Sequence, residues 1–281
     1  RRAPQDDGER AGGLPDAFIT GTTLGLGAAD IPHLAFQAID STNAEALRRA
    51  RDGETGPVWI TAERQSAGRG RRGRAWTSAS GNLFASLLLA DPAPIPEASQ
   101  ISFVTALAVH DAVCAVAPSL APRLTLKWPN DLLCGGRKLS GILVEGETRH
   151  GLVVVVGIGI NCAHHPDDTL YPATDLAAEG AAASPAAVFL ALAGAMRARL
   201  AEWDRSRGFA SIRDAWLARG PVPGTPLMVR FEGTETAGRF ETIDGHGNLL
   251  ITGDEGVQKI AAGDVFPLHR PDALPSNRRD A

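Results

Sequence analysis

One nine-residue segment, GRGRRGRAW (residues 68–76), concentrates positive charge in a chain that is otherwise slightly acidic. It holds four arginines and three glycines, whereas the 281-residue chain has 28 Lys and Arg against 32 Asp and Glu, a formal net charge of −4. Guanidinium groups bind phosphate and carboxylate groups bidentately, and glycines let a backbone approach a ligand closely. The segment therefore predicts a clamp for an anion, with a solvent-exposed basic patch as the alternative.

Three other segments combine polar residues with strand-like apolar sequence. KWPND (residues 127–131) ends a strand in a lysine, a Trp-Pro turn and an Asn-Asp pair, and GRKLSGILVEG (136–146) has a lysine ahead of an apolar strand. GIGIN (157–161) places two glycines on a strand apolar enough to be buried. Glycine weakens a strand, so its presence there indicates that another group approaches the backbone closely. Taken singly, these segments also have structural explanations: a turn, a solvated strand end and a packing requirement.

The segment GRGRRG (68–73) also matches the G-x-G-x-x-G pattern of dinucleotide-binding proteins, with Asp91 about 20 residues further on. That pattern binds a dinucleotide only when it opens a helix whose N-terminus faces the pyrophosphate. Here RAWTSASGN follows, which leaves no room for a helix before the next predicted strand. The sequence therefore argues against a Rossmann domain.

Hydrophobic patterning predicts the scaffold that must position these segments. Strands are predicted at residues 33–40, 58–65, 82–90, 124–128, 138–147 and 152–161, and helices at 42–51, 99–116, 184–205 and 209–219. Thr42 and Glu45 fit a capping box at the start of the first helix. After the linker GPVPG (220–224), short strands at 226–231, 238–244, 248–253 and 257–263 predict a small barrel as a second domain.

Composition excludes several classes of protein. Apolar residues make up 44% of the chain and charged residues 21%, as in an ordinary soluble globular protein. The first residues lack the apolar region of a secretory signal, and the longest apolar run (152–160) is shorter than the roughly 20 residues that a membrane helix needs. Cys114, Cys134 and Cys162 show no metal-ligand spacing, which predicts reduced thiols in a cytoplasmic protein.

Together with DSTN (40–43), RQSAGRGRRGRAW (64–76) and the predicted barrel, these segments resemble the biotin–protein ligases in order and spacing over about residues 33–270. The resemblance implies an α/β (α+β) fold with a mixed central sheet and flanking helices, of the class II synthetase-like biotin/lipoate ligase type, followed by a small C-terminal SH3-like β-barrel. It implies a flexible N-terminal tail at 1–30, a catalytic domain at 31–220, the barrel at 221–271 and a disordered tail at 272–281.

The activity that the resemblance implies has two steps. Biotin and MgATP give biotinyl-5′-AMP and pyrophosphate, and the biotinyl group then passes to a lysine of a biotin carboxyl carrier protein domain. The first step brings together two anions, so positive charge lowers their repulsion and stabilises the transition state. Its product is a reactive mixed anhydride, so a loop that closes over it keeps water away. The resemblance implies no metal bound by the protein alone, no membrane, no specific DNA, and a cytoplasmic monomer or weak homodimer.

The resemblance also assigns roles to individual residues. For biotin binding it implies Ser41, Thr42, Asn43, Gln65, Gly68, Arg69, Gly70, Arg71, Lys138, Gly141 and Gly157. For ATP and the adenylate it implies Arg69, Arg71, Trp76, Lys127, Asn130, Asp131, Lys138 and Asn161. Lys138, Arg71 and Asp131 are the expected catalytic residues, with Asp131 near the triphosphate and Mg²⁺ or near the incoming lysine. Arg270 is a further candidate that would reach back from the barrel.

Three alternative functions remain open from the sequence. A lipoate–protein ligase shares the ancestral fold and the adenylate chemistry, but the arginine segment and KWPND favour biotin. A biotin sensor without turnover would not need the full set of polar residues. A ligand-responsive repressor is not expected, because only about 30 polar residues precede the first predicted strand and they suggest no recognition helix.

Overall fold

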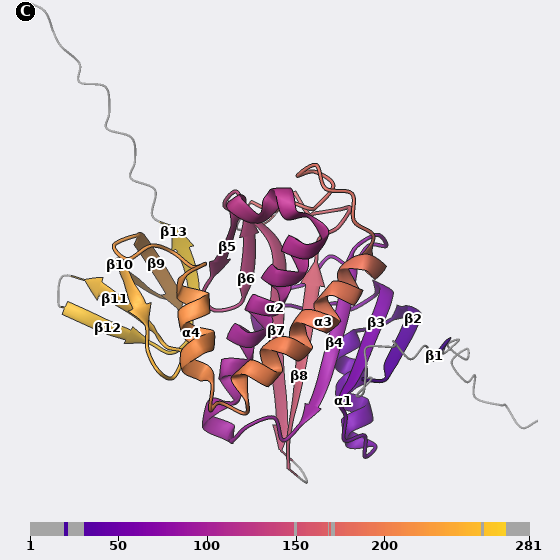
Figure 1. Cartoon of the computed structure of the whole chain (residues 1–281). Helices are drawn as coiled ribbons and strands as arrows, with labels where there is room; N and C mark the ends of the chain where they lie inside the picture. The colour runs from indigo at the N-terminus through magenta and orange to yellow at the C-terminus, as the bar shows by residue number, and fades with distance from the viewer. Residues whose placement is uncertain are drawn as a thin grey trace, which may run out of the picture.

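The computed structural model describes residues 20–21, 31–148, 151–167, 169, 172–253 and 256–267. Within these ranges an eight-stranded sheet forms the centre of the larger part of the molecule, and a five-stranded sheet forms the C-terminal part (Figure 1). The tails predicted at 1–30 and 272–281 lie outside the described residues except for 20–21, and so does Arg270.

The large sheet has the strand order β1-β2-β3-β4-β8-β7-β6-β5. Its strands are β1 (Thr20–Gly21), β2 (His33–Ile39), β3 (Val58–Gln65), β4 (Leu83–Ala90), β5 (Leu124–Lys127), β6 (Asp131–Cys134), β7 (Arg137–Thr148) and β8 (Leu152–Ile160). β2 and β3 run parallel and the other neighbours run antiparallel, so the sheet is mixed, as the family resemblance implied. β6 was not predicted, because four residues directly after a turn carry too little periodicity.

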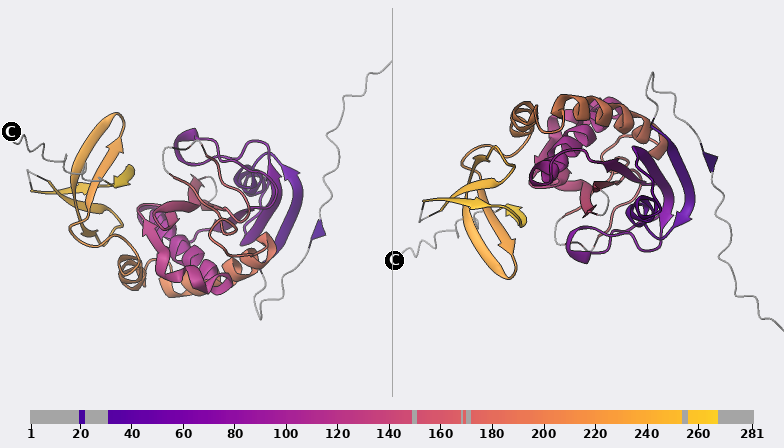
Figure 2. Two further views of the ribbon diagram at one scale, coloured as in Figure 1. Left: turned by 90° about the horizontal axis from the view of Figure 1, so that it is seen from above. Right: turned by 90° about the horizontal axis from the view of Figure 1, so that it is seen from below.

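Helices cover the two faces of the large sheet unequally (Figures 1 and 2). Val154 and Val156 of β8 join the main core under the larger group of helices, whereas Val155 joins a smaller cluster with Ala46 and Leu47 of the remaining helix. Alternate residues of a strand point to opposite faces, so the two clusters lie on opposite sides of the sheet. The helices are α1 (Thr42–Arg51) on one face, and α2 (Ile101–Val116), α3 (Pro185–Trp203) and α4 (Phe209–Leu217) on the other.

By length and composition alone, the segment Ile95–Val116 is the one helix in the described part of the chain that could cross a membrane. In the structure it consists of a 3-10 helix (Ile95–Gln100) followed by α2, and it packs between the large sheet and α3. Leu107, Ala108 and Val109 have no exposed surface, so its apolar composition is that of a core helix.

The start of α1 differs from the predicted capping box. The N-cap is Ser41, whose hydroxyl accepts a hydrogen bond from the Ala44 amide (3.4 Å), and Glu45 pairs with Arg48 and Arg49 instead of reaching back. Thr42 is the first helical residue, and its amide and hydroxyl donate to Gln65 Oε1 (2.8 and 3.2 Å). The hydroxyl predicted to cap the helix therefore bonds to a neighbouring strand.

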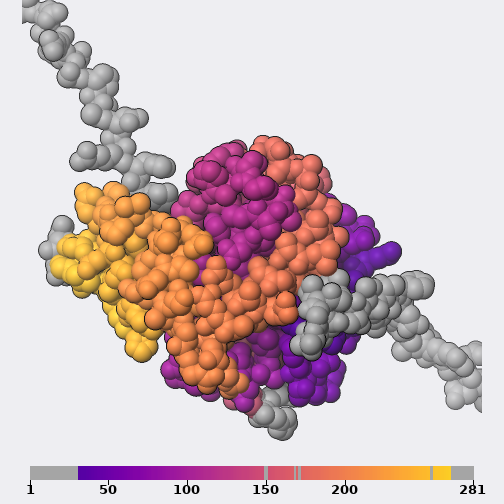
Figure 3. Space-filling view, in the orientation of Figure 1, coloured from indigo at the N-terminus to yellow at the C-terminus, as the bar shows by residue number. Residues whose placement is uncertain are grey.

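The C-terminal sheet is antiparallel, in the order β12-β11-β10-β9-β13. Its strands are β9 (Pro226–Phe231), β10 (Thr234–Ile243), β11 (Leu249–Gly253), β12 (Gly256–Ile260) and β13 (Asp264–Pro267), the last of which was not predicted. The sheet packs beside α4 (Figure 3), where Arg213 donates to the Ile243 carbonyl. Trp128 Nε1 donates to the Gly247 carbonyl (3.1 Å), which connects this sheet to the KWPND turn.

Candidate active site

A cavity of about 470 Å³ opens on the α1 face of the large sheet. Between them, the arginine segment, the KWPND turn, the β7 and β8 strands and the loop after β8 supply most of its walls. The predicted site residues that line it are Ser41, Thr42, Asn43, Gln65, Arg69, Gly70, Arg71, Trp76, Lys127, Asn130, Asp131, Lys138, Gly141, Gly157 and Asn161. Of the predicted set, Gly68 does not line the cavity and Arg270 lies outside the described residues.

One end of the cavity is a network of neutral polar groups around the start of α1. The Ser86 hydroxyl, fully buried on β4, lies 2.7 Å from Thr42 Oγ1 and 2.5 Å from Asn43 Oδ1. Asn43 Nδ2 donates to Glu145 (2.8 Å), and Gln65 is oriented by its bond to Ser78 (3.0 Å). Because these groups are held by one another, they present fixed donors and acceptors to a polar ligand.

The arginine segment forms a hairpin over the cavity, which we call the lid (residues 68–76). The Trp76 amide donates to the Gly68 carbonyl (2.9 Å) and the Gly70 amide to the Arg74 carbonyl (2.7 Å), so the two arms pair. Arg72 at the tip has a φ of +57°. A Cβ on Gly68 would lie 2.4 Å from Ser78 Oγ, which explains a glycine at the base of the lid without contact to the cavity.

Trp76 extends from the lid across β7 and β8. A Cβ on Gly159 would lie 2.5 Å from its ring, and one on Gly141 would lie 2.9 Å from it. A Cβ on Gly157 would lie 2.3 Å from Asn43 Oδ1. The strand glycines therefore admit close neighbours, as the sequence predicted, and these neighbours are the side chains of Trp76 and Asn43. A contact of Gly141 or Gly157 with a ligand stays a prediction.

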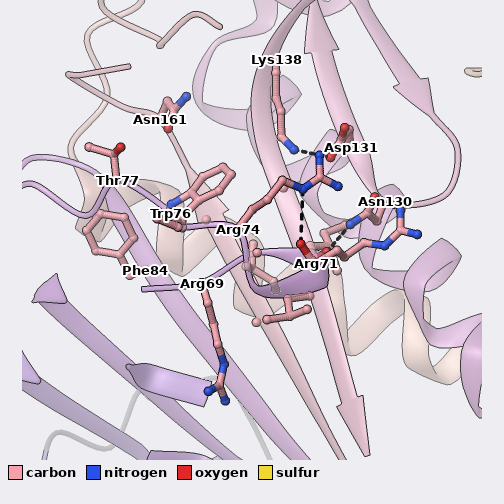
Figure 4. A pocket seen from close by; sticks show the side chains of 18 of the residues that line it. Arg69, Arg71, Arg74, Trp76, Thr77, Phe84, Asn130, Asp131, Lys138 and Asn161 are labelled. Atoms are coloured by element: carbon pink, nitrogen blue, oxygen red, sulfur yellow. Dashed lines mark hydrogen bonds and ion pairs between the residues drawn. The ribbon is translucent and has the colours of Figure 1, made fainter. Parts of the chain in front are cut away.

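The cationic end of the cavity is organised by one buried carboxylate. Asp131, 5% exposed, lies 2.6 Å from the Lys138 ammonium group (Figure 4) and 3.0 Å from that of Lys127. Burial by itself would raise the pKa of Asp131, but the two lysines lower it more, and its net pKa falls below the ordinary value. Burial lowers the pKa of Lys127, against the pull of Asp131. Asp131 is thus ionised at neutral pH and fixes both lysines.

Arg71 contributes a third cation to this end, beside Lys127 and Lys138. Its Nη1 donates to Asn130 Oδ1 (3.3 Å), and Asn130 is in turn held by the Ile142 carbonyl. Burial lowers the pKa of Arg71, but a guanidinium stays protonated at neutral pH. Arg69 points away from this cluster toward Glu145 (Figure 4), with which it pairs at 3.2 Å. The lid therefore sends different arginines to the two ends of the cavity.

The cavity thus has a neutral polar end, a cationic end and a lid with an indole between them. Residues 35–161 match the model of the biotin/lipoate A/B protein ligase family, and residues 228–266 match that of the biotin protein ligase C-terminal domain. The chain is 43% identical over 235 residues to the biotin–[acetyl-CoA-carboxylase] ligase of Paracoccus denitrificans, covering 81% of this chain and 97% of that protein. The chain belongs to the biotin–protein ligase family.

Two further likenesses agree with this assignment. The biotin–[acetyl-CoA-carboxylase] ligase of Mycobacterium tuberculosis is 32% identical over 233 residues, covering 81% of this chain and 86% of that protein. The structure of Aquifex aeolicus biotin protein ligase in complex with biotin and ATP matches with a TM-score of 0.71 and 24% identity over 84% of this chain and 99% of that chain. At this identity the likeness concerns the fold, and it confirms the mixed sheet with a C-terminal SH3-like domain.

Sequence reasoning missed a residue of this biotin–protein ligase that shapes the loop after β8. Asn82, 4% exposed, accepts hydrogen bonds at Oδ1 from three consecutive amides, those of Cys162 (2.8 Å), Ala163 (3.0 Å) and His164 (3.2 Å). Its Nδ2 donates to the His164 carbonyl (2.8 Å). These bonds fix the turn directly after Asn161, which lines the cavity.

A second missed residue holds the far end of the same loop. The Glu179 side chain, 2% exposed, accepts from Thr174 Oγ1 (2.6 Å) and pairs with Arg137 (2.5 Å) and Arg123. Thr174 accepts from Asn161 Nδ2 through its carbonyl (2.9 Å), and its amide donates to the Lys138 carbonyl (2.9 Å). Glu179 therefore positions the backbone that orients two cavity residues.

Replacing Asn82 tests its role as a brace for the loop. Asn82→Ala leaves three amides without an acceptor, so we expect a loss of about 1–3 kcal/mol in the free energy of unfolding and faster hydrogen exchange of the amides of residues 162–164. Asn82→Asp keeps the acceptor and should retain most of the protection. The measurement is mass-spectrometric hydrogen exchange beside thermal melting. Asn248→Ala, in a turn of the C-terminal sheet, is the control, and equal exchange at 162–164 in both alanine variants would contradict the role.

Proposed function

We propose that this family member forms biotinyl-5′-AMP from biotin and ATP and transfers the biotinyl group to a lysine of a biotin carboxyl carrier protein domain. The relatives from P. denitrificans and M. tuberculosis are both named biotin–[acetyl-CoA-carboxylase] ligases, which supports this reaction for a chain so similar to them. The enzyme class is that of a biotin–protein ligase.

The observation that carries the proposal is the division of one cavity into two chemical environments. Thr42 and Asn43, both held by the buried hydroxyl of Ser86, offer neutral polar groups, which suit the uncharged ureido ring of biotin. Lys138 and Arg71 at the opposite end suit a carboxylate and the phosphates of ATP. Trp76 lies between them, and its buried Nε1 has no hydrogen-bond partner among the described residues, so it can donate to a ligand acceptor.

In the first step a biotin carboxylate oxygen attacks the α-phosphorus of ATP, forming an O–P bond while the bond to the β-phosphate oxygen breaks and pyrophosphate leaves. Both reactants are anions, so the chain must reduce their repulsion and stabilise charge on the phosphorus oxygens. Lys138 and Arg71 do this as positioned cations, and catalysis depends mainly on orientation. Mg²⁺ enters with ATP as part of that substrate, and it partly neutralises the phosphate charge.

The surroundings of Asp131 bear on the two roles that the family resemblance allows for it. Asp131 already accepts hydrogen bonds from two ammonium groups, and these groups lower its pKa. It is therefore a poor base for removing a proton from the carrier lysine. We therefore propose that Asp131 orients Lys138 and Lys127 toward the phosphates instead of deprotonating the incoming lysine.

In the second step the ε-amine of the carrier lysine attacks the biotinyl carbonyl. An amide bond forms, the bond to the AMP oxygen breaks, and the amine loses a proton to solvent. Until then the mixed anhydride must be kept from water, which is the purpose of the lid. We place this reaction in the cytoplasm, in a monomer or weak homodimer without specific DNA binding, because Cys114, Cys134 and Cys162 are free thiols and the chain has a net negative charge of −4.

The substrate assignment is tested by comparing biotin with lipoate. Biotin together with MgATP should release pyrophosphate and raise the melting temperature by mass action, whereas lipoate at the same concentration should do neither. Coupled pyrophosphate release and thermal melting are the measurements. Equal pyrophosphate release with lipoate would move the chain to the lipoate branch of the family.

Lys138→Ala should lower the rate of biotinyl-AMP formation by roughly 10²–10³-fold, because a positioned charge at the reacting centre is lost. The fold should persist, since Lys127 still neutralises Asp131. Pyrophosphate release is the measurement, with melting temperature to verify folding. Lys259→Ala, which removes an exposed lysine paired with Asp244, is the control. A rate within a few-fold of the unchanged protein would remove Lys138 from the catalytic set.

Arg71→Gly should still form the adenylate, but more slowly, since Lys138 and MgATP still supply positive charge at the reacting groups, and it should release biotinyl-AMP faster. Loss of one charge-assisted contact costs about 1.5–3 kcal/mol, or roughly ten- to hundredfold in the dissociation rate. The released adenylate should then biotinylate lysines of albumin added as a bystander. Arg51→Gly, at a surface ion pair with Glu147, is the matched control. Parent-like albumin labelling by Arg71→Gly would show that Arg71 does not retain the intermediate.

A further inference from the structure

One carboxylate of the C-terminal sheet receives three arginines of the lid. Asp264 is the first residue of β13, and its side chain is 15% exposed. Arg74 Nη2 lies 2.8 Å from both of its oxygens, while Arg71 and Arg72 each approach it to 3.7 Å. The contact joins segments 190 residues apart in the sequence.

Two more contacts join the same surfaces. Arg71 Nη2 donates to the Gly263 carbonyl (3.1 Å), and the guanidinium of Arg72 lies 5.0 Å above the ring of Phe231 on β9. A Cβ on Gly263 would lie 2.5 Å from the Val229 side chain, so a glycine is required for the chain to pass this close to β9. The tip of the lid therefore contacts the C-terminal sheet through each of its three arginines.

Arg74 and Arg71 have different principal partners. Arg74 makes the close contact with Asp264, whereas Arg71 stays more distant from it and bonds instead to Asn130 at the cavity. A single carboxylate neutralises only part of the charge of three guanidinium groups. The lid tip is thus held to the C-terminal sheet while its remaining positive charge is available to the cavity.

We propose that Asp264 is a positioning residue for the lid: through Arg74 it holds the hairpin tip over the cavity, so that Arg71 is placed to retain the activated intermediate. The retention part of this inference rests on the proposed function, whereas the holding of the lid does not. The C-terminal sheet then takes part in keeping the intermediate.

The first experiment measures the lid without any ligand. Trypsin cleaves after arginine, and cleavage after Arg69, Arg71 or Arg72, which every variant keeps, requires the lid to open, so its rate reports the open population when closing is fast. Asp264→Ala should accelerate cleavage in this segment about tenfold, and Asp264→Asn should do nearly the same because the charge is lost. Asp264→Glu should remain near the parent. Glu235→Ala, which breaks an exposed pair with Arg230 on the same sheet, should leave lid cleavage unchanged.

The second experiment measures retention. Asp264→Ala should form biotinyl-AMP at a rate within a few-fold of the parent but release it about tenfold faster, equivalent to about 1.4 kcal/mol. Arg74→Ala should behave alike, and the double variant should be no worse than either single variant, because both remove one interaction. If Asp264→Ala loses its cooperative melting transition, lid cleavage and adenylate release are measured on Arg74→Ala instead.

The outcomes separate the two proposals. Unchanged lid cleavage in Asp264→Ala and Arg74→Ala, or additive effects of the two substitutions, would overturn the role of Asp264. Faster cleavage with an unchanged rate of adenylate release would show that Asp264 holds the lid but that the lid does not retain the intermediate. A parent protein that forms no biotinyl-AMP would refute the proposed function, while the cleavage result would still decide whether Asp264 holds the lid.

Discussion

Two neighbouring strands, β7 and β8, must satisfy opposite requirements on their two faces. On one face their valines and isoleucines form the core under α2 and α3, and on the other face the same strands must leave space for a cavity. The two-residue period of a strand meets both demands, since Ile158 and Ile160 point inward while Gly157 and Gly159 leave room outside. Without this alternation there would be no place for Trp76, for Asn43 or for a ligand beside them.

Electrostatics in the molecule is equally local. The chain has a net negative charge, yet the cavity wall combines Lys127, Lys138 and Arg71 within a small region. Buried Asp131 compensates the charges of the two neighbouring lysines. Asp264 and Glu145 form ion pairs with arginines of the lid. Acidic groups therefore lie where the cations of the cavity and the lid would otherwise repel one another.

Much of this arrangement was predictable from the sequence, because motifs and strand periodicity are local signals. The GIGIN segment predicted close approach of another group to the backbone, and KWPND predicted polar groups at a strand end. The site residues of both segments line the cavity. Ser86, Asn82 and Glu179 gave no such signal, since each looks ordinary among its neighbours and bonds to partners at least 42 residues away, which for Glu179 are Arg123 and Arg137. The capping-box error has the same origin. The sequence pattern predicted that Thr42 caps its own helix, but in the fold Thr42 bonds to Gln65, which lies 23 residues further along the chain.

The hydrogen bond from Trp128 to Gly247 has a consequence for biosynthesis. Trp128 is 3% exposed in the turn that carries Asn130 and Asp131, and its partner is made 119 residues later. At about 5–20 residues per second of translation, the turn is synthesised roughly 6–24 seconds before the carbonyl that accepts from its indole. Until Gly247 has been made, the indole nitrogen of Trp128 lacks this acceptor. The turn that carries Asn130 and Asp131 is therefore completed only once the C-terminal sheet has been made.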